Sequence, residues 1–153
     1  VAALDGVVRR RILDALADVQ RVTGLCIIFI SHDLGVVQSR AHLVADMYLG
    51  RVVEVGPTGA VFSEPRHPYT RALIDAVPLP DPHAPGGLAT LDGEIPSPLA
   101  PPPGCSFATR CAWAGPDCQA ALPVLEPQEG VRVACIRAAE LDLRAGGSSS
   151  GPR

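Results

Sequence analysis

The chain has 153 residues, of which 47% are hydrophobic and 19% charged, and its formal net charge at pH 7 is −3. This acidic balance excludes nucleic acid as the main partner, because binding to phosphates requires clustered Lys and Arg. No apolar stretch reaches the roughly 20 residues that a membrane-spanning helix needs, and the first residues lack the pattern of a secretory signal. We therefore expect a cytoplasmic protein whose association with a membrane is made through partners.

The first part of the chain combines a helical pattern with a strand pattern. Val8, Ile12, Leu16 and Val19 recur at helical spacing, which predicts an amphipathic helix over residues 6–22. Residues 25–30 are then a continuous apolar run, typical of a strand covered on both faces in a parallel sheet, with Cys26 as a small core residue. A helix followed by a buried strand predicts half of a βαβ unit and an α/β fold.

Shorter signals predict the next elements. We expect a short helix over residues 34–40, a hairpin of residues 44–49 and 51–55 that turns at Gly50, and a helix that begins at Pro68. Residues 78–103 are dense in Pro and Gly, which regular elements do not tolerate. This change in composition predicts a division into residues 1–77, residues 78–137 and a flexible tail at 138–153.

Six segments together carry a resemblance to a known family. They are ALD at 3–5, IFISHDL at 28–34, MYLGRVVEVG at 47–56, HPYTRAL at 67–73, GEIPSP at 93–98 and PPPGCSF at 101–107. Over about residues 2–135 the chain resembles the ATP-binding subunits of bacterial oligopeptide and dipeptide ABC transporters. The resemblance implies the C-terminal part of a P-loop ABC ATPase domain, followed by a loop-rich, cysteine-containing C-terminal extension.

The resemblance gives two residues roles near ATP. His32 follows the expected strand at its carboxyl end, where open α/β sheets bind ligands, and it would contact the γ-phosphate. The alternative for His32 is an ordinary loop histidine. Asp5 would be the D-loop aspartate at the interface of two ATPase subunits, and it is equally suited to cap the helix that follows. The intact protein would use ATP and Mg²⁺ as cofactors.

Several parts of an ATPase are absent from the sequence. The chain contains no G-x-x-x-x-G-K-[ST] segment to cradle phosphates, no Lys at any position and no ABC signature loop, and it begins after the expected position of the strand with the catalytic Glu. Phosphoryl transfer depends on this positioning, so we expect the chain alone to be inactive, whereas an intact subunit would hydrolyse ATP to drive peptide import. The implied partners are transmembrane permease subunits and a second ATPase subunit, with a peptide-binding protein acting indirectly. The location would be the inner face of the cell membrane.

Four cysteines form a second constellation. Cys105, Cys111, Cys118 and Cys135 are spaced C-x5-C-x6-C-x16-C, and four thiolates can hold a [4Fe-4S] cluster or zinc. The absence of C-x2-C knuckles makes zinc the weaker choice, and free thiols or oxidised pairs remain an alternative. The resemblance implies an iron-sulfur cluster, because some members of the family carry one in this extension. Two rival functions are an inactive remnant and a stand-alone metal-binding module.

Two further features bear on the resemblance. Asp46 lies in an expected strand where the family usually has an aliphatic residue, and an unpaired buried carboxylate is costly. Asp46 therefore indicates either an exposed edge or weakened selection. His67, Pro68 and Tyr69 are specific to the family and could be read as a site, but we interpret them as a helix start that packs the ATPase part against the extension.

Overall fold

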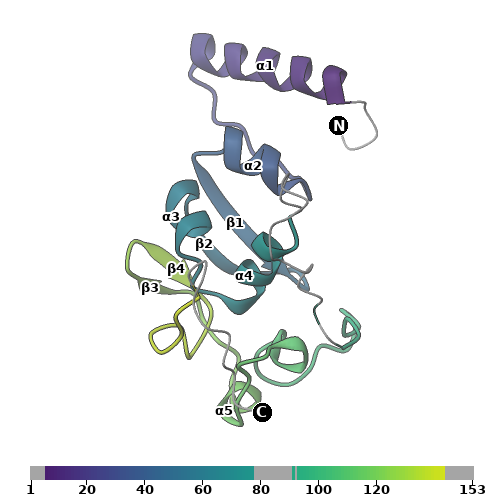
Figure 1. Ribbon diagram of the computed structural model, residues 1–153, viewed down its shortest axis with the longest axis vertical. Coiled ribbons are helices and arrows are strands. Elements are labelled where there is room, and N and C mark those ends of the chain that lie inside the picture. Colours follow the sequence, from purple (N-terminus) through teal and green to yellow (C-terminus); the bar gives the residue numbers. More distant parts are fainter. Residues whose placement is uncertain (1–5, 78–90, 92, 144–153) are drawn as a thin grey trace, which may run out of the picture. The chain divides into compact units, whose positions relative to one another are not determined.

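The computed structural model describes residues 6–77, 91 and 93–143 (Figure 1). The chain divides into two compact units, residues 1–33 and residues 34–153. No helix in the described ranges is both long enough and apolar enough to cross a membrane.

The first unit consists of one long helix and an extended segment. Helix α1 spans Gly6–Thr23, which confirms the predicted helix. It ends at Gly24, whose amide donates to the Gln20 carbonyl at 2.8 Å. Gly24 has φ +71°, a left-handed conformation that glycine adopts without steric cost and that commonly ends helices.

The strand predicted over residues 25–30 is wrong. This segment is extended but belongs to no sheet, and Ile28 and Ile30 are 90% and 93% exposed. Cys26, expected in the core, is exposed as well. A strand needs hydrogen-bonding neighbours on its edges and covered faces, and the described residues supply neither to this segment. Residues 25–30 therefore have the composition of a buried strand, but no neighbouring strand among the described residues buries them.

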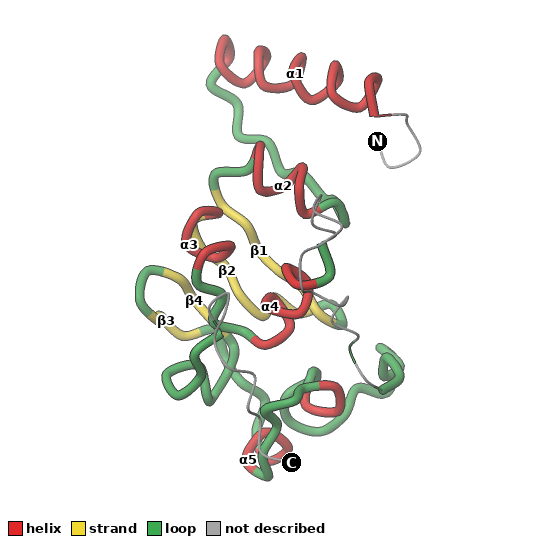
Figure 2. The backbone as a smooth tube through the Cα atoms, in the orientation of Figure 1, coloured by secondary structure: helices red, strands yellow, loops and turns green. Residues whose placement is uncertain are grey.

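The second unit contains one antiparallel sheet (Figures 1 and 2). Its strands are β1 (Leu43–Tyr48), β2 (Arg51–Pro57), β3 (Glu126–Gln128) and β4 (Val131–Val133), in the order β1-β2-β4-β3. The predicted hairpin is confirmed as β1 and β2, which turn at Leu49 and Gly50, both with positive φ. The parallel sheet expected from the sequence is not present among the described residues, because all pairings there are antiparallel.

Three helices accompany the hairpin. They are α2 (Leu34–Arg40), α3 (Thr58–Ser63) and α4 (Pro68–Asp75), and the first and last confirm predicted helices. Helix α3 contacts α2, β1 and β2. One apolar core forms from buried side chains of α2, β1, α3 and β4, namely Val37, Val44, Val61 and Val131. The core therefore joins the hairpin to a strand that lies far along the chain.

The extension is mostly loops, as Figure 2 shows, with short helices at Ala108–Arg110 and at α5 (Asp117–Ala120). Its strand β4 pairs with β2, with Glu54 opposite Val133, so the sheet crosses the boundary expected near residue 78. In the segment expected as a tail, Leu143 is buried and its carbonyl accepts a hydrogen bond from Arg71 at 3.2 Å. Residues 144–153 lie outside the described ranges.

Candidate functional site

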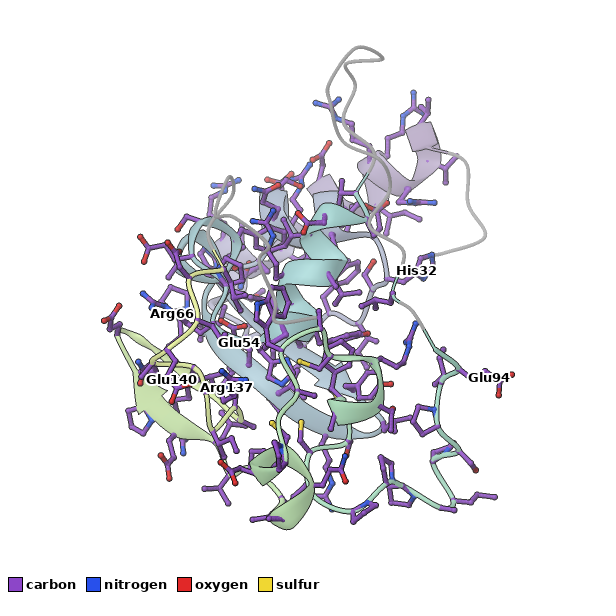
Figure 3. All side chains as sticks on the ribbon, turned by 60° about the horizontal axis from the view of Figure 1, so that its bottom comes forward. His32, Glu54, Arg66, Glu94, Arg137 and Glu140 are labelled. Carbon is purple, nitrogen blue, oxygen red and sulfur yellow. The ribbon has the colours of Figure 1, made fainter. Side chains whose placement is uncertain are left out.

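The loop that carries His32 is held by local contacts in the first unit. The Asp33 carboxylate accepts from Arg9 of α1 at 2.7 Å, and the Asp33 amide donates to the Ser31 hydroxyl at 3.0 Å. Between them the side chain of His32 is exposed (Figure 3). The ion pair fixes the end of this loop on α1 and leaves the imidazole of His32 accessible. Asp5 lies outside the described residues.

The HPY segment, which consists of His67, Pro68 and Tyr69, begins helix α4, as predicted. His67 is the N-cap residue and Pro68 lies in the first turn, a position where the missing amide of proline removes no helical hydrogen bond. The imidazole Nδ1 of His67 accepts from the Tyr69 amide at 3.0 Å. His67 is almost completely buried, and burial lowers its pKa to about 4. The ring is therefore neutral near pH 7, with its lone pair on Nδ1 and its proton on Nε2.

Glu54 anchors the same helix from the sheet, and sequence reasoning missed this role. Its carboxylate accepts from the Arg66 amide at 2.8 Å and from the His67 amide at 2.9 Å, although its side chain is 0% exposed. Figure 3 shows Glu54 and Arg66 side by side. The carboxylate thus satisfies two amides just before α4, where a negative charge is also favoured by the helix dipole. The only sequence signal is one Glu within an apolar strand.

Phe107 joins the extension to the hairpin and to α4. Its ring is 2% exposed and lies within 6 Å, centroid to centroid, of the rings of Tyr48, His67 and Tyr69. Cys105 and Cys111 pack against the same cluster. Edge-on aromatic contacts of this kind add specific geometry to the burial of apolar area. The HPY segment is therefore a packing surface between the hairpin region and the extension, as the sequence analysis expected.

The four cysteines of the extension come together, although they are not arranged as ligands. The Cys105 amide donates to the Cys118 carbonyl at 2.7 Å, and the Gly115 amide donates to the sulfur of Cys118 at 3.5 Å. Cys105, Cys118 and Cys135 each act electrostatically on at least one other thiol of the four, and Cys111 is affected by all three. All four are free. Across residues 6–77, 91 and 93–143, however, no three His, Cys, Asp or Glu side chains are placed to hold a metal ion.

Burial sets the chemistry of three of these thiols. It raises the pKa of Cys111 and of Cys135 to about 11, and the neighbouring cysteines add to the increase. Burial also raises the pKa of Cys105. Since the thiolate is the form that attacks electrophiles and binds metals, these cysteines are poorly reactive while no cation is present. A bound metal would have to displace their protons.

Comparison with known protein families finds a match for the middle of the chain. Residues 53–118 match the family described as "Oligopeptide/dipeptide transporter, C-terminal region". The matched range begins within β2 and ends within α5, so it contains Glu54, the HPY segment, Phe107 and three of the four cysteines.

Longer similarity connects the chain to curated proteins. It is 52% identical over 136 residues to the Sinorhizobium fredii protein named "Probable peptide ABC transporter ATP-binding protein y4tS", covering 88% of this chain and 38% of that protein. It is 46% identical to the Escherichia coli oligopeptide transport ATP-binding protein OppF, covering 90% of this chain and 42% of OppF. For the E. coli dipeptide transport ATP-binding protein DppF the identity is 47%, covering 89% and 41%.

The chain spans about two fifths of the length of these relatives. Within that span the similarity covers both described units, because it includes about nine tenths of the chain. The chain therefore carries the oligopeptide/dipeptide transporter C-terminal region and is related, over nearly all of its length, to the ATP-binding proteins of peptide ABC transporters.

Proposed function

We propose that this chain forms the C-terminal part of an ATP-binding subunit that drives the import of oligopeptides or dipeptides. The observation that carries the proposal is identity of 44–52% to peptide transport ATP-binding proteins over about nine tenths of the chain. The match of residues 53–118 to the transporter C-terminal region supports it independently. A stand-alone metal-binding module would not explain the similarity outside the extension.

Within this proposal His32 and Asp5 serve ATP. The imidazole of His32 is exposed, and the next residue, Asp33, is held to α1 by its ion pair with Arg9. This arrangement leaves His32 free to donate to a phosphate oxygen. Asp5 would face a second ATPase subunit across the dimer interface. ATP and Mg²⁺ are the cofactors of the intact subunit, and residues 1–77 are its ATPase part, with residues 78–137 as the extension.

The partners follow from the same proposal. Permease subunits in the membrane would receive the motion of two ATPase subunits as they close on ATP, and a peptide-binding protein would deliver the substrate. The subunit would therefore act at the inner face of the membrane, through the permease. The transport class predicts no contact with nucleic acid, in keeping with the acidic net charge.

Calorimetry of ATP binding tests the proposal. We expect no binding by this chain, which has no Lys and no P-loop segment, and Mg²⁺-dependent binding by the same chain extended upstream through a P-loop. His32→Ala in the extended form should lower hydrolysis much more than binding, because the residue contacts only the γ-phosphate. His42→Ala, at another exposed histidine, is the matched control. Equal losses in both variants, or binding by the present chain, would contradict the proposal.

A second proposal concerns the extension: we infer that Cys105, Cys111, Cys118 and Cys135 bind a [4Fe-4S] cluster. The supporting observation is that the fold of the extension brings four free thiols, one of them in α5, into electrostatic interaction with one another. Four thiolates are the usual donor set of such a cluster. The described geometry is not that of a metal site, so binding would require a rearrangement of the sulfur atoms and loss of their protons.

Anaerobic purification tests this second proposal. We expect iron and sulfide in the purified chain, together with visible absorbance that Cys111→Ser abolishes. Cys26→Ser is the matched control, since Cys26 is exposed and lies in the other unit. Iron-free protein after anaerobic purification, or equal loss of absorbance in both variants, would reject a cluster at these cysteines.

A further inference from the structure

Two carboxyl groups face each other inside the second unit. Asp46 of β1 and Glu54 of β2 are partners across the antiparallel ladder, so their side chains emerge on the same face of the sheet. Asp46 is 9% exposed and Glu54 is 0% exposed. Two ionised carboxylates in such a place would repel each other, and each would also lose its hydration. Asp46 is therefore not at an exposed edge, the first of the two readings that the sequence offered.

No cation offsets these charges among the described residues. Helix α4 presents His67, Tyr69 and Thr70 to this region, and the His67 ring is neutral near pH 7. The guanidinium groups nearby interact with other groups. Arg66 pairs with Glu64 and Glu129, and Arg71 pairs with Asp75. Arg132 donates to the Leu125 carbonyl, and the charge of Arg110 acts on the pKa of Tyr69. The pair must therefore lower its own charge by keeping a proton.

The contacts decide which carboxyl group keeps the proton. Glu54 accepts two backbone amides at 2.8 and 2.9 Å, and amide donors stabilise the ionised form of a carboxyl group. Asp46 receives no backbone donor that compares with these. The buried Thr70 hydroxyl lies close enough to favour ionisation of both groups, yet it meets neither with ordinary hydrogen-bond geometry. The donors therefore favour ionisation of Glu54 over ionisation of Asp46.

We propose that Asp46 and Glu54 form a proton-sharing carboxyl pair beneath helix α4. In this pair Asp46 remains a neutral carboxylic acid at neutral pH, while ionised Glu54 holds the first amides of the helix. Loss of the Asp46 proton at higher pH places a second charge in the same buried space and loosens α4 from the hairpin. The pair thus makes the docking of this helix dependent on pH.

Burial raises the pKa of Asp46 and of Glu54, and charge repulsion between the two adds to the increase for whichever group ionises second. A carboxyl group whose pKa is higher in the folded state takes up a proton on folding, so its contribution to stability is lost as pH rises through that pKa. Alkaline conditions therefore weaken the pair.

Unfolding by urea at a series of pH values between about 5 and 8 tests the proposal on the full chain. The variants are Asp46→Asn, Glu54→Gln and, as a control, Glu94→Gln, which removes an exposed carboxyl group (Figure 3). Relative to Asp46→Asn, the wild-type unfolding equilibrium constant should rise by about tenfold per pH unit, the value for one proton bound on folding. Glu94→Gln should follow the wild type.

Three outcomes separate the alternatives. A constant ratio between wild type and Asp46→Asn would mean that Asp46 is ionised in the folded protein, and the proposal would fail. Loss of the pH dependence in Glu54→Gln but not in Asp46→Asn would place the proton on Glu54 and overturn the assignment. With Asp46 as the proton holder, Glu54→Gln should instead accelerate amide hydrogen exchange at residues 66 and 67, whereas Asp46→Asn should not.

A measurement on the unmodified protein guards against variants that do not fold. With carbon-13 in the aspartate carboxyl groups, one resonance should retain the chemical shift of an un-ionised acid at neutral pH, and it should titrate only at alkaline pH. Ionised shifts for all aspartates in the folded wild type would refute the proposal without any variant.

Discussion

Residues 6–33 and residues 34–143 contain similar apolar segments, but the first region leaves most of them exposed. Val19, Val22 and Ile28 of the first region are exposed, whereas Val44, Val53 and Val61 of the second are buried. Periodicity identifies a helix or strand from its own residues, whereas burial requires partners from elsewhere. The second region supplies its partners from the extension, through β4 and Phe107.

The largest loss of stability should come from removing the Phe107 ring from the aromatic cluster of the second region. Phe107→Ala removes a fully buried ring and leaves a cavity among Tyr48, His67 and Tyr69, which should lower the free energy of unfolding by about 4 kcal/mol. Urea unfolding followed by Trp113 fluorescence measures it. Leu99→Ala removes an exposed side chain from the same extension and should change stability by less than about 0.5 kcal/mol. Similar losses in the two variants would show that Phe107 is not a packing centre.

The next effect concerns the close approach of two loops in the extension. Gly104 has φ +71°, and a Cβ atom there would collide with the Cys118 carbonyl. Gly104→Ala should therefore destabilise the protein by about 3 kcal/mol through strain and overpacking. Gly59→Ala is the control, because Gly59 lies in α3 with open space around its Cβ position and alanine favours helix. A neutral Gly104→Ala variant would show that the loops separate easily.

The third effect is a dependence of stability on pH that arises from His67. Its pKa falls from 6.5 to about 4 on burial, so the unfolded chain takes up a proton at higher pH than the folded chain. Stability is therefore full above about pH 6.5 and is lost as pH falls toward 4, by about 3 kcal/mol in total. Asp46 acts with the opposite sign over a range of pH that overlaps this one, so the His67 contribution is measured as the difference in stability between the wild type and a variant without this imidazole.

His67→Asn isolates this effect. Asparagine is a good N-cap residue and can accept the Tyr69 amide, but it does not titrate. The variant should lose the decline in stability between about pH 6.5 and pH 4, as measured by urea unfolding at each pH. His42→Asn, at an exposed position, should keep the wild-type profile. An unchanged profile in His67→Asn would show that another group causes the decline.

The smallest effect should arise in the first region. Ile28→Thr replaces a side chain that is already in solvent, and it should change the free energy of unfolding by less than about 0.5 kcal/mol. It should nevertheless reduce self-association, because exposed apolar runs promote aggregation. Light scattering at increasing concentration measures this. A large loss of stability would mean that this segment has a buried partner within the chain.

The elements that the sequence predicted correctly are those with local signals. Gly50 marks the hairpin turn, Pro68 marks the start of α4, and the spacing of Val8, Ile12 and Leu16 marks α1. Strands β3 and β4 escaped prediction because each has only three residues, too few to show alternation. The strand over residues 25–30 failed for the opposite reason, since its apolar signal is strong but its pairing depends on residues elsewhere.

The candidate site likewise combines features that the sequence located with features that only the structure shows. The family resemblance located His32 and the four cysteines along the chain, and the structure adds the Arg9–Asp33 ion pair and the closeness of the thiols. Glu54 and Asp46 could not be recognised as a pair, because a register shift in β1 and the docking of α4 together place them in one buried space. A charged residue in an apolar strand signals that some partner exists, but it does not identify the partner.

The pairing of β4 with β2 also has a consequence for synthesis on the ribosome. Glu54 pairs with Val133, so the hairpin and α4 emerge well before the strand that completes their sheet. Until then the outer edge of β2 offers unpaired amides and carbonyls to any neighbouring strand, including that of another nascent chain. Slow translation between the two segments would lengthen this exposure, and the yield of folded protein should therefore depend on the rate of elongation.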